Sequence, residues 1–500
     1  MTSCLGDIME KISSNDIELK KRRRYYLHAA ICLLITFGTG FIPPVGSITP
    51  TGMQAIGIFV GMLYGWSTME MLWPSLLGIV AIGLSGYTNM AGAFKSAVGD
   101  NLTLQIISVL LFAAYMEKSG LSLFISRWFA SRKLSVGRPW VMSLMVLTSS
   151  FVLSVFTNGS AAIIISWSFF YKILESCNYT RKDAYTNVML FGIVFAGLVG
   201  AVCLPYQVMS VIYLDALKTS TGIEMNPLVY FFSRSAISYI LILIFWLICR
   251  FIIRPDTSKL LQAGDLFASM RDDKMTSEQK IAISAFIIFL LALFAPGNLP
   301  KSWPLVGVLG KLGLVGIATS IFIILSIVHV IRDGKSVALM NFSELMKTGM
   351  NWNLILCIAV TAPMANMLES DKTGVFNQFI AIFEPLTRSM GTLGFVFIVV
   401  LFVGILTQIS HNTVLARVIT PMLLPLAATI GINPIAMMMV IVLPIQVAVC
   451  TPGASGNAAL IWSNTEWVQK KWVFSLCMLS FVLTLVYSLI LLPVLLAIFN

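Results

Sequence analysis

The chain has 500 residues, of which 58% are hydrophobic and 11% charged, with a formal net charge of +11. A soluble protein of this length could not keep so many apolar side chains out of water, so the composition indicates a membrane protein. The apolar runs are continuous rather than alternating, which excludes a β-barrel and favours transmembrane helices. The sequence carries no motif for nucleotide hydrolysis, zinc proteolysis or dinucleotide binding. It therefore predicts neither an enzyme nor a pump driven by ATP hydrolysis, and no cofactor is expected.

The polar segment 1–24 ends in a basic cluster that runs from Lys20 to Arg24. Such a cluster is typical of a cytoplasmic tail next to a membrane, and we favour this role over nucleic-acid binding. No small-residue cleavage pattern follows, so a cleavable signal peptide is not expected. The first transmembrane helix is predicted within residues 25–48. The predicted location is the cell (inner) membrane, with the lipid bilayer as solvent.

Hydropathy predicts about eleven transmembrane helices along the chain. They cover residues 25–42, 51–66, 70–86, 102–116, 187–214, 228–252, 280–294, 305–331, 351–368, 435–462 and 472–499. The predicted fold class is thus an all-α polytopic membrane protein.

Two further apolar segments, 140–174 and 393–426, are each interrupted by a short polar tip. The arms on either side have about 14 to 18 apolar residues, fewer than the ~20 that a full span needs. The first tip contains no Lys, Arg or Pro, unlike a typical external loop. We interpret both segments as re-entrant hairpins that end near the middle of the membrane. The alternative is two short full spans joined by a tight turn.

The charge distribution gives an orientation. With the N-terminus in the cytoplasm, most of the 33 Lys and Arg residues fall in cytoplasmic loops, as the positive-inside rule requires. The first hairpin then opens to the cytoplasm, and the second hairpin and the C-terminus face outside. The exceptions expected outside are Lys95, Lys218, Arg234, Lys301, Lys311, Lys372 and Arg388.

The two halves of the chain repeat the same order of parts. Residues 49–254 form the first repeat and 280–500 the second, joined by a polar cytoplasmic linker, 255–279. In each repeat a hairpin is followed by an interrupted apolar helix, 187–214 and 435–462. The spans between the copies place them upside down relative to each other. Inverted repeats with broken helices at matching positions are the sequence pattern of a secondary transporter and indicate its site.

Hydroxyl and amide side chains at the two hairpin tips are the candidate substrate ligands. Helix ends that stop inside a membrane present N–H groups suited to anions, and their exposed carbonyls suit small cations such as sodium. Neutral donors can hold a carboxylate without adding fixed charge. The alternative is that these residues only cap the hairpin helices. They are Thr157, Asn158, Ser160, Ser410, Asn412 and Thr413.

Two ionisable residues of the second hairpin have two interpretations each. His411 either contacts substrate and makes transport depend on pH, or is a neutral histidine bonded to a carbonyl. Arg417 lies about 7 Å along the helical arm from Asn412. It either faces the cavity and pairs with a carboxylate or extends outward to the membrane surface.

The hairpin tips, the turn MEKSGL at 116–121 and the break Thr451-Pro452-x-x-x-x-Asn457 resemble those of the divalent anion:sodium symporter (DASS) family of the ion transporter superfamily. The resemblance covers nearly the whole chain in order. It implies a scaffold domain that forms a homodimer, a mobile transport domain and elevator-like alternating access. The implied substrates are di- or tricarboxylates or sulfate-like anions, usually coupled to sodium.

The resemblance also implies the wider binding site. Substrate contacts would include Gly159, Pro205, Thr451 and Pro452 with the tip residues, and sodium would contact Asn158, Asn412, Cys450, Gly453 and Asn457. His411 and Arg417 are candidate substrate contacts because of their own chemistry and not because of the resemblance. The chain departs from the family pattern at three places. The first tip reads Thr157-Asn158-Gly159, His411 is inserted in the second, and the break at 203–207 lacks the Gly-Thr pair and the terminal Asn. The first sodium site is therefore the harder one to build.

Two alternatives within the same fold remain open. One is a cation-independent anion exchanger, which the degraded first break favours, and the other is a transporter of another small anion such as sulfate. Gly57, Gly61 and Gly65 form two GxxxG steps, which predict close helix packing. A dimer interface at these glycines is a weaker inference from the same pattern.

Overall fold

The structure is a computed structural model of the chain. It describes residues 2–130, 137–157, 159–263, 275–332 and 335–499. The chain divides into two compact units, and each is described by itself. Unit 1 comprises Met1–Asp100 and Trp352–Pro385, and unit 2 comprises Asn101–Asn351 and Leu386–Asn500.

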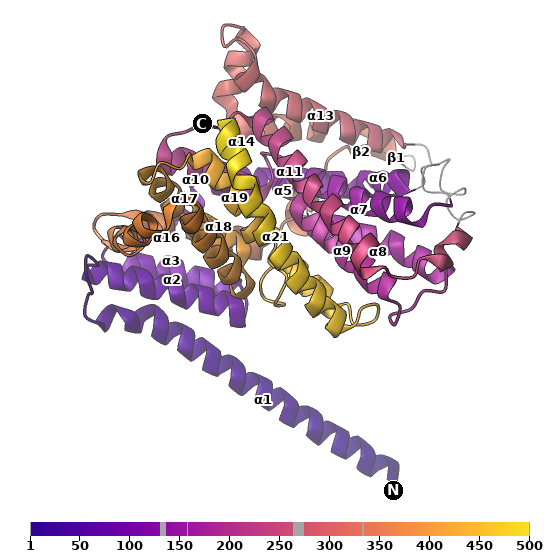
Figure 1. Cartoon of the computed structure of the whole chain (residues 1–500), viewed down its shortest axis with the longest axis horizontal. Coiled ribbons are helices and arrows are strands. Elements are labelled where there is room, and N and C mark those ends of the chain that lie inside the picture. Colours follow the sequence, from indigo (N-terminus) through magenta and orange to yellow (C-terminus); the bar gives the residue numbers. More distant parts are fainter. Residues whose placement is uncertain (1, 131–136, 158, 264–274, 333–334, 500) are drawn as a thin grey trace. The chain divides into compact units, whose positions relative to one another are not determined.

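Unit 1 is made of the N-terminal helices, drawn in indigo, and a later internal segment, Trp352–Pro385, drawn in orange-brown (Figure 1). Its elements are α1 (Thr2–Gly38), η1 (Thr39–Phe41), α2 (Pro50–Thr68), α3 (Leu72–Leu84), α4 (Met90–Val98), α16 (Trp352–Glu369) and the first part of α17 (Val375–Ile409). The turn before α2 is joined to the turn after α16, because Thr49 N donates to Thr373 O at 2.9 Å.

The glycines Gly57, Gly61 and Gly65 of α2 face other helices of the same chain. A Cβ at Gly57 or Gly61 would clash with α1, and one at Gly65 would clash with Pro74 of α3. The close packing expected from the GxxxG steps is therefore used within unit 1. A dimer interface would need other residues.

Unit 2 holds both hairpins and both interrupted helices. In the first half its elements are α5 (Asn101–Lys118), α6 (Leu121–Ala130), α7 (Pro139–Phe156), α8 (Gly159–Ser176), α9 (Ala184–Gly200), α10 (Val208–Thr221), α11 (Pro227–Ile248), η3 (Cys249–Ile253) and η4 (Ser258–Ala263). Then follow α13 (Ser277–Asn298), α14 (Pro304–Ile327), β1 (His329–Arg332), β2 (Lys335–Ala338), α15 (Phe342–Thr348), the rest of α17, α18 (Asn412–Thr429), α19 (Pro434–Gln446), α20 (Gly456–Ser463) and α21 (Lys470–Phe499).

Local sequence signals set where these helices begin. Asn226 and Asn433 accept hydrogen bonds from the first backbone N–H groups of α11 and α19, and a proline follows each at the first helical position. Thr276 and Gln279 form a reciprocal capping box at the start of α13. Helix α17 is kinked at Gly391, whose φ of 66° suits glycine.

The core of unit 2 is formed by α9 and α19, the leading halves of the two interrupted helices. From Tyr185 to Gly200 every residue of α9 is buried. Hairpin arm α7 packs tightly on α9, since Ser150 Oγ donates to Ile193 O at 2.9 Å and a Cβ at Gly200 would lie 2.6 Å from a backbone oxygen of α7. The first hairpin is thus fixed against the first interrupted helix.

The fold class is that of an all-α polytopic membrane protein with two helical hairpins. Within the described part of the chain, nine helices are long and apolar enough to cross a membrane, and three of them are hairpin arms, Pro139–Phe156, Gly391–Ile409 and Asn412–Thr429. Each predicted span overlaps a helix or a pair of helices, although the span predicted at 305–331 runs past the end of α14 into β1. The hairpin α7–α8 precedes the broken pair α9–α10, and the hairpin α17–α18 precedes the pair α19–α20.

The structure also differs from the sequence-based predictions. Helix α1 continues without interruption from the basic tail into the first predicted span. Residues 329–338, partly assigned to a span, form the antiparallel pair β1–β2. Arg234 was expected outside but has an exposed fraction of 0%, since it lies two turns inside α11 and other helices cover it. The side chain of Arg388 and linker residues 264–274 lie outside what the structure describes.

Candidate functional site

The tip of the second hairpin is a short turn between two helices. Helix α17 ends at Ile409 and α18 begins at Asn412, with His411 as the N-terminal flanking residue. The residues of the turn are nearly inaccessible, with exposed fractions of 3% for Ser410 and 6% for Asn412. The backbone N–H of Asn412 donates to Ala454 O at 3.2 Å. This tip is therefore joined to the break of the second interrupted helix.

Gln408, next to this tip, satisfies the backbone of the second break. Its Oε1 accepts hydrogen bonds from Val449 N and Cys450 N, each at 2.9 Å, and its Nε2 donates to Val447 O at 2.8 Å. Thr451 Oγ1 donates to the Gln408 carbonyl at 2.6 Å. One side chain thus replaces the helical bonds that α19 loses where it ends.

The tip of the first hairpin also contacts the second break. Thr157 ends α7, and its hydroxyl donates to Leu153 O at 2.7 Å, which is a local bond. Ser160 Oγ donates to Asn457 Oδ1 at 2.6 Å, and a Cβ at Gly159 would lie 3.6 Å from Asn457 Nδ2. Asn158 lies outside the described residues.

A glutamine also joins the first break to the first hairpin, but here the glutamine belongs to the break and bonds to the backbone of the hairpin. Gln207 belongs to the break, and its Nε2 donates to Val155 O at 3.0 Å and to Thr157 O at 2.9 Å in the first hairpin. The neighbouring Tyr206 donates its hydroxyl to Leu293 O of α13 at 3.1 Å. Pro205 and Tyr206 line a cavity described below.

Both hairpins thus meet at one short segment, Ala454 to Asn457. The second hairpin bonds to its first residue and the first hairpin to its last. Within this arrangement α8, α18 and α20 each begin at a tip or a break, so three helix N-termini lie in the same region of unit 2. Helix N-termini carry partial positive charge and free N–H groups, which favours an anion among them.

Carbonyl groups of the second break are the available cation ligands. The carbonyls of Val447, Ala448 and Ala454 accept hydrogen bonds from Gln408, Ser455 and Asn412. From the residues that the structure describes, the carbonyls of Cys450 and Gly453 accept none. Pro452 and Gly453 are also exposed. Hard oxygen ligands of this kind suit sodium.

Arg417 is buried and forms an ion pair. Its Nη1 lies 2.5 Å from Asp215 Oδ2, and the side chains are 8% and 22% exposed. Arg417 is on α18 and Asp215 on α10, so the pair joins the second hairpin to the first interrupted helix. His411 is 7% exposed, and its Nδ1 has no hydrogen-bond partner within the described residues.

A cavity of about 710 Å³ lies beside this ion pair. Asp215 and two residues of the first break, Pro205 and Tyr206, are in its wall. The other charged residues of its wall are Lys218, Glu224, Lys301 and Lys311. Lys218 is paired with Glu224 at 2.5 Å. The wall as a whole carries three lysines and two carboxylates, one of which already neutralises Arg417.

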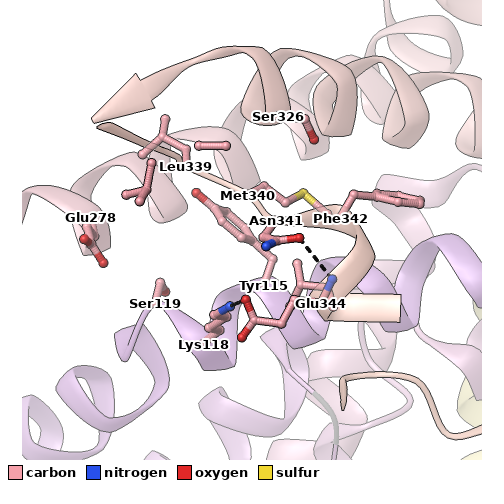
Figure 2. A pocket seen from close by; sticks show the side chains of 13 residues that line it. Tyr115, Lys118, Ser119, Glu278, Ser326, Leu339, Met340, Asn341, Phe342 and Glu344 are labelled. Atoms are coloured by element: carbon pink, nitrogen blue, oxygen red, sulfur yellow. Dashed lines mark hydrogen bonds and ion pairs between the residues drawn. The ribbon is translucent and has the colours of Figure 1, made fainter. Parts of the chain in front are cut away.

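A second cavity, of about 400 Å³, lies between the ends of α5 and α14 and the strand β2 (Figure 2). Lys118 forms an ion pair with Glu344 at 2.6 Å across it, and Glu278 is also in its wall. It contains no residue of either tip or either break. With two carboxylates to one lysine, this cavity is poorly suited to a dianion.

Sequence reasoning missed Gln408 and Asp215 as site residues. Gln408 was part of the polar tip predicted from Thr407 to Thr413, but it had no assigned role. Asp215 follows the end of a predicted span and is a carboxylate within reach of an intramembrane arginine. Gln207 was part of the predicted break but had no assigned role.

Comparison with known proteins agrees with this architecture. The family model described as "Sodium:sulfate symporter transmembrane region" matches residues 23–498. The sodium-dependent dicarboxylate transporter SdcS of Staphylococcus saprophyticus is 21% identical over 475 residues, which is 90% of this chain and 89% of that protein. The crystal structure of the YdaH transporter of Alcanivorax borkumensis is similar in fold, with a TM-score of 0.54, 13% identity and coverage of 89% of this chain and 98% of that one. The chain is therefore a multi-pass membrane transporter of the sodium:sulfate symporter family, the DASS family to which its hairpin tips pointed.

Proposed function

We propose that the chain is a sodium-coupled symporter of small organic anions, with di- or tricarboxylates as substrates. The observation that carries the proposal is the meeting of both hairpins at the segment from Ala454 to Asn457. It gathers helix N-termini for an anion beside carbonyls for a cation. The similarity to a sodium-dependent dicarboxylate transporter supports the same substrate class.

In this proposal the substrate carboxylates contact the tip residues, with Thr157, Asn158, Gly159 and Ser160 on one side and Ser410, His411, Asn412 and Thr413 on the other. Thr451, Pro452 and Pro205 complete the site from the breaks. Arg417 contributes to the substrate site through its ion pair with Asp215, because that carboxylate already balances the charge of the guanidinium. The cavity of about 710 Å³ contains three lysines and is the entrance for the anion.

Sodium binds at the second break, through the free carbonyls of Cys450 and Gly453 together with Asn412 and Asn457. At the first break Asn158 would be a sodium ligand, but this break offers fewer free carbonyl groups. The carbonyl of Val202 accepts a hydrogen bond from the Tyr230 hydroxyl at 2.9 Å, and that of Leu204 accepts one from Gln207 N at 3.0 Å. We therefore propose that coupling depends mainly on the second site.

The remaining parts of the proposal concern the membrane. The N-terminus is cytoplasmic and the C-terminus outside, the protein forms a homodimer, and transport follows an elevator motion of the hairpin-bearing part. Hydrogen bonds between hairpins and breaks support this motion, because they hold the site together as one body while it moves.

A cation-independent exchanger is the second candidate, and the occupied carbonyls of the first break favour it. A sodium titration of carboxylate uptake into proteoliposomes separates the two. A symporter shows uptake that rises with sodium and stops without it. An exchanger shows counterflow that is unaffected by replacing sodium with choline.

The site is tested by thermal shift of the purified protein with carboxylates and with sulfate, each with and without sodium. Asn158→Ala and Asn412→Ala are expected to fold but to lose the stabilisation that the carboxylate gives the unmodified protein. Asn353→Ala, at an exposed asparagine of α16, is the control and keeps the full shift. Full ligand shifts in both tip variants would overturn the site, and a larger response to sulfate would change the substrate class.

A further inference from the structure

Arg234 is a buried cation that the proposed transport site does not use. It lies on α11 and has an exposed fraction of 0%. Its Nη1 donates to Met439 O at 2.9 Å, and its Nε donates to Ser238 Oγ at 3.4 Å. Its second terminal nitrogen, Nη2, has no hydrogen-bond partner in the described part of the chain.

The charge of Arg234 also lacks a counterion. No Asp or Glu that the structure describes forms an ion pair with it, whereas the buried Arg417 has Asp215. Arginine keeps its proton in proteins, and an unpaired charge inside a protein costs several kcal/mol. Two neutral acceptors alone balance it poorly, so a further anionic group is expected beside the guanidinium.

Two more donors near Arg234 are unused. Tyr213 interacts electrostatically with the guanidinium, and its hydroxyl has no hydrogen-bond partner among described residues. The hydroxyl of Ser210, one turn earlier on α10, lies near the Tyr230 hydroxyl but makes no hydrogen bond of good distance and angle among the described residues. Ser210 and Tyr213 both have exposed fractions of 0%. Buried donors are seldom left unsatisfied, so three in one region indicate a bound acceptor.

The position on α10 favours an anion as that acceptor. Ser210 is in the first turn of α10, where the helix dipole is positive. Gln207, the residue before this helix, makes no capping bond there because its amide is bonded to the first hairpin. Ser210 and Tyr213 lie on a different face of α10 from Asp215 and Lys218, which line the large cavity.

We infer that unit 2 contains a buried site for a small monovalent anion of the halide class, held by Arg234 Nη2, Tyr213 OH and Ser210 Oγ. None of three described cavities of unit 2 includes these residues in its wall, so a ligand among them would have to be as small as a single-atom anion, and a carboxylate substrate does not fit. The anion neutralises Arg234 within the packed interior and stabilises the arrangement of α10, α11 and α19. It is independent of the transported substrate.

The test uses the purified full-length protein without substrate. Its melting temperature is compared in sodium chloride, sodium bromide and sodium gluconate at equal ionic strength. Chloride and bromide are expected to raise the apparent melting temperature by about 2–6 °C over gluconate. Crystals grown in bromide are expected to show an anomalous peak within hydrogen-bond distance of Arg234 Nη2.

Tyr213→Phe removes one donor and nothing else that is bonded, so it should lose most of the halide shift. Tyr487→Phe is the matched control, because its hydroxyl donates to Ile237 O at 2.8 Å and is already used. The control is expected to melt lower in every salt but to keep the full halide shift. Equal melting temperatures in chloride and gluconate, the absence of a bromide peak, or a full shift in Tyr213→Phe would each overturn the site.

Discussion

Replacing Gln408 by leucine tests whether one side chain holds the second break in its binding shape. Leucine is similar in size but cannot accept from Val449 N or donate to Val447 O. Both of these residues are buried, so two backbone groups lose their partners inside the protein. Each such group costs about 1–3 kcal/mol, which gives about 2–6 kcal/mol for the two. The N–H of Cys450, which is half-buried, can bond to water and adds little.

A loss of this size is comparable with the total stability of many domains, about 5–15 kcal/mol. We expect the break to rearrange rather than to remain unsatisfied. The protein would melt several degrees lower. Because 1.4 kcal/mol corresponds to a factor of ten in affinity, the sodium concentration for half-maximal uptake should rise more than tenfold.

The assay is sodium-dependent uptake of labelled succinate into proteoliposomes, with the melting temperature measured in parallel. Gln469→Leu is the control, because that glutamine is at the surface and donates only a 3.3 Å bond through its side chain. Gln408→Glu refines the test, since its carboxylate still accepts from both N–H groups but cannot donate to Val447 O. It should be more stable than Gln408→Leu yet bind the anion weakly. Normal sodium dependence in Gln408→Leu would refute the reasoning.

Three further predictions follow from pairs seen in the structure. Ser160→Ala removes the bond between the first hairpin and α20, worth about 0.5–1.5 kcal/mol, and should raise the half-saturating sodium concentration about 2–10-fold; an unchanged titration of uptake would contradict this. Asp215→Asn removes the carboxylate that pairs with Arg417, so the melting temperature should fall without substrate and recover more on adding carboxylate than in the unmodified protein. Equal ligand shifts in thermal-shift assays would show that the substrate does not reach this region. Burial alone would raise the pKa of Asp183, but hydrogen bonds from Lys259 and the preceding turn lower it overall. The carboxylate therefore stabilises the fold at neutral pH and loses this effect as pH falls below about 4. The unmodified protein should be more stable than Lys259→Met by at most about 1 kcal/mol at neutral pH, and melting curves taken at decreasing pH should show this difference disappear.

The sequence was sufficient to predict the helices and the order of the repeats, for a physical reason. In lipid the backbone must bond within its own segment, so a long apolar run has few alternatives to a helix. The hairpins were detectable because their tips are polar in otherwise apolar segments. The breaks were detectable because Pro205 and Pro452 interrupt helices at matching places.

Tertiary contacts account for what the sequence did not predict. Hydropathy placed Arg234 at the outer side of a span, but burial of that residue depends in part on α19 and α21, which follow it by about 200 residues or more. The role of Gln408 depends on a segment about forty residues later, which a local pattern does not contain. The strands β1 and β2 are four residues each, too short to stand out from the end of the preceding apolar run.

The half-buried state of Cys450 has a practical consequence for experiments on this transporter. Six of the other seven cysteines are buried: Cys32, Cys177, Cys203, Cys249, Cys357 and Cys477. The side chain of Cys4, in the polar N-terminal segment, lies outside what the structure describes. In a Cys4→Ser chain a water-soluble thiol reagent should therefore react at the second break before it reaches the six buried thiols, and the rate of labelling with and without sodium would report occupancy of the site.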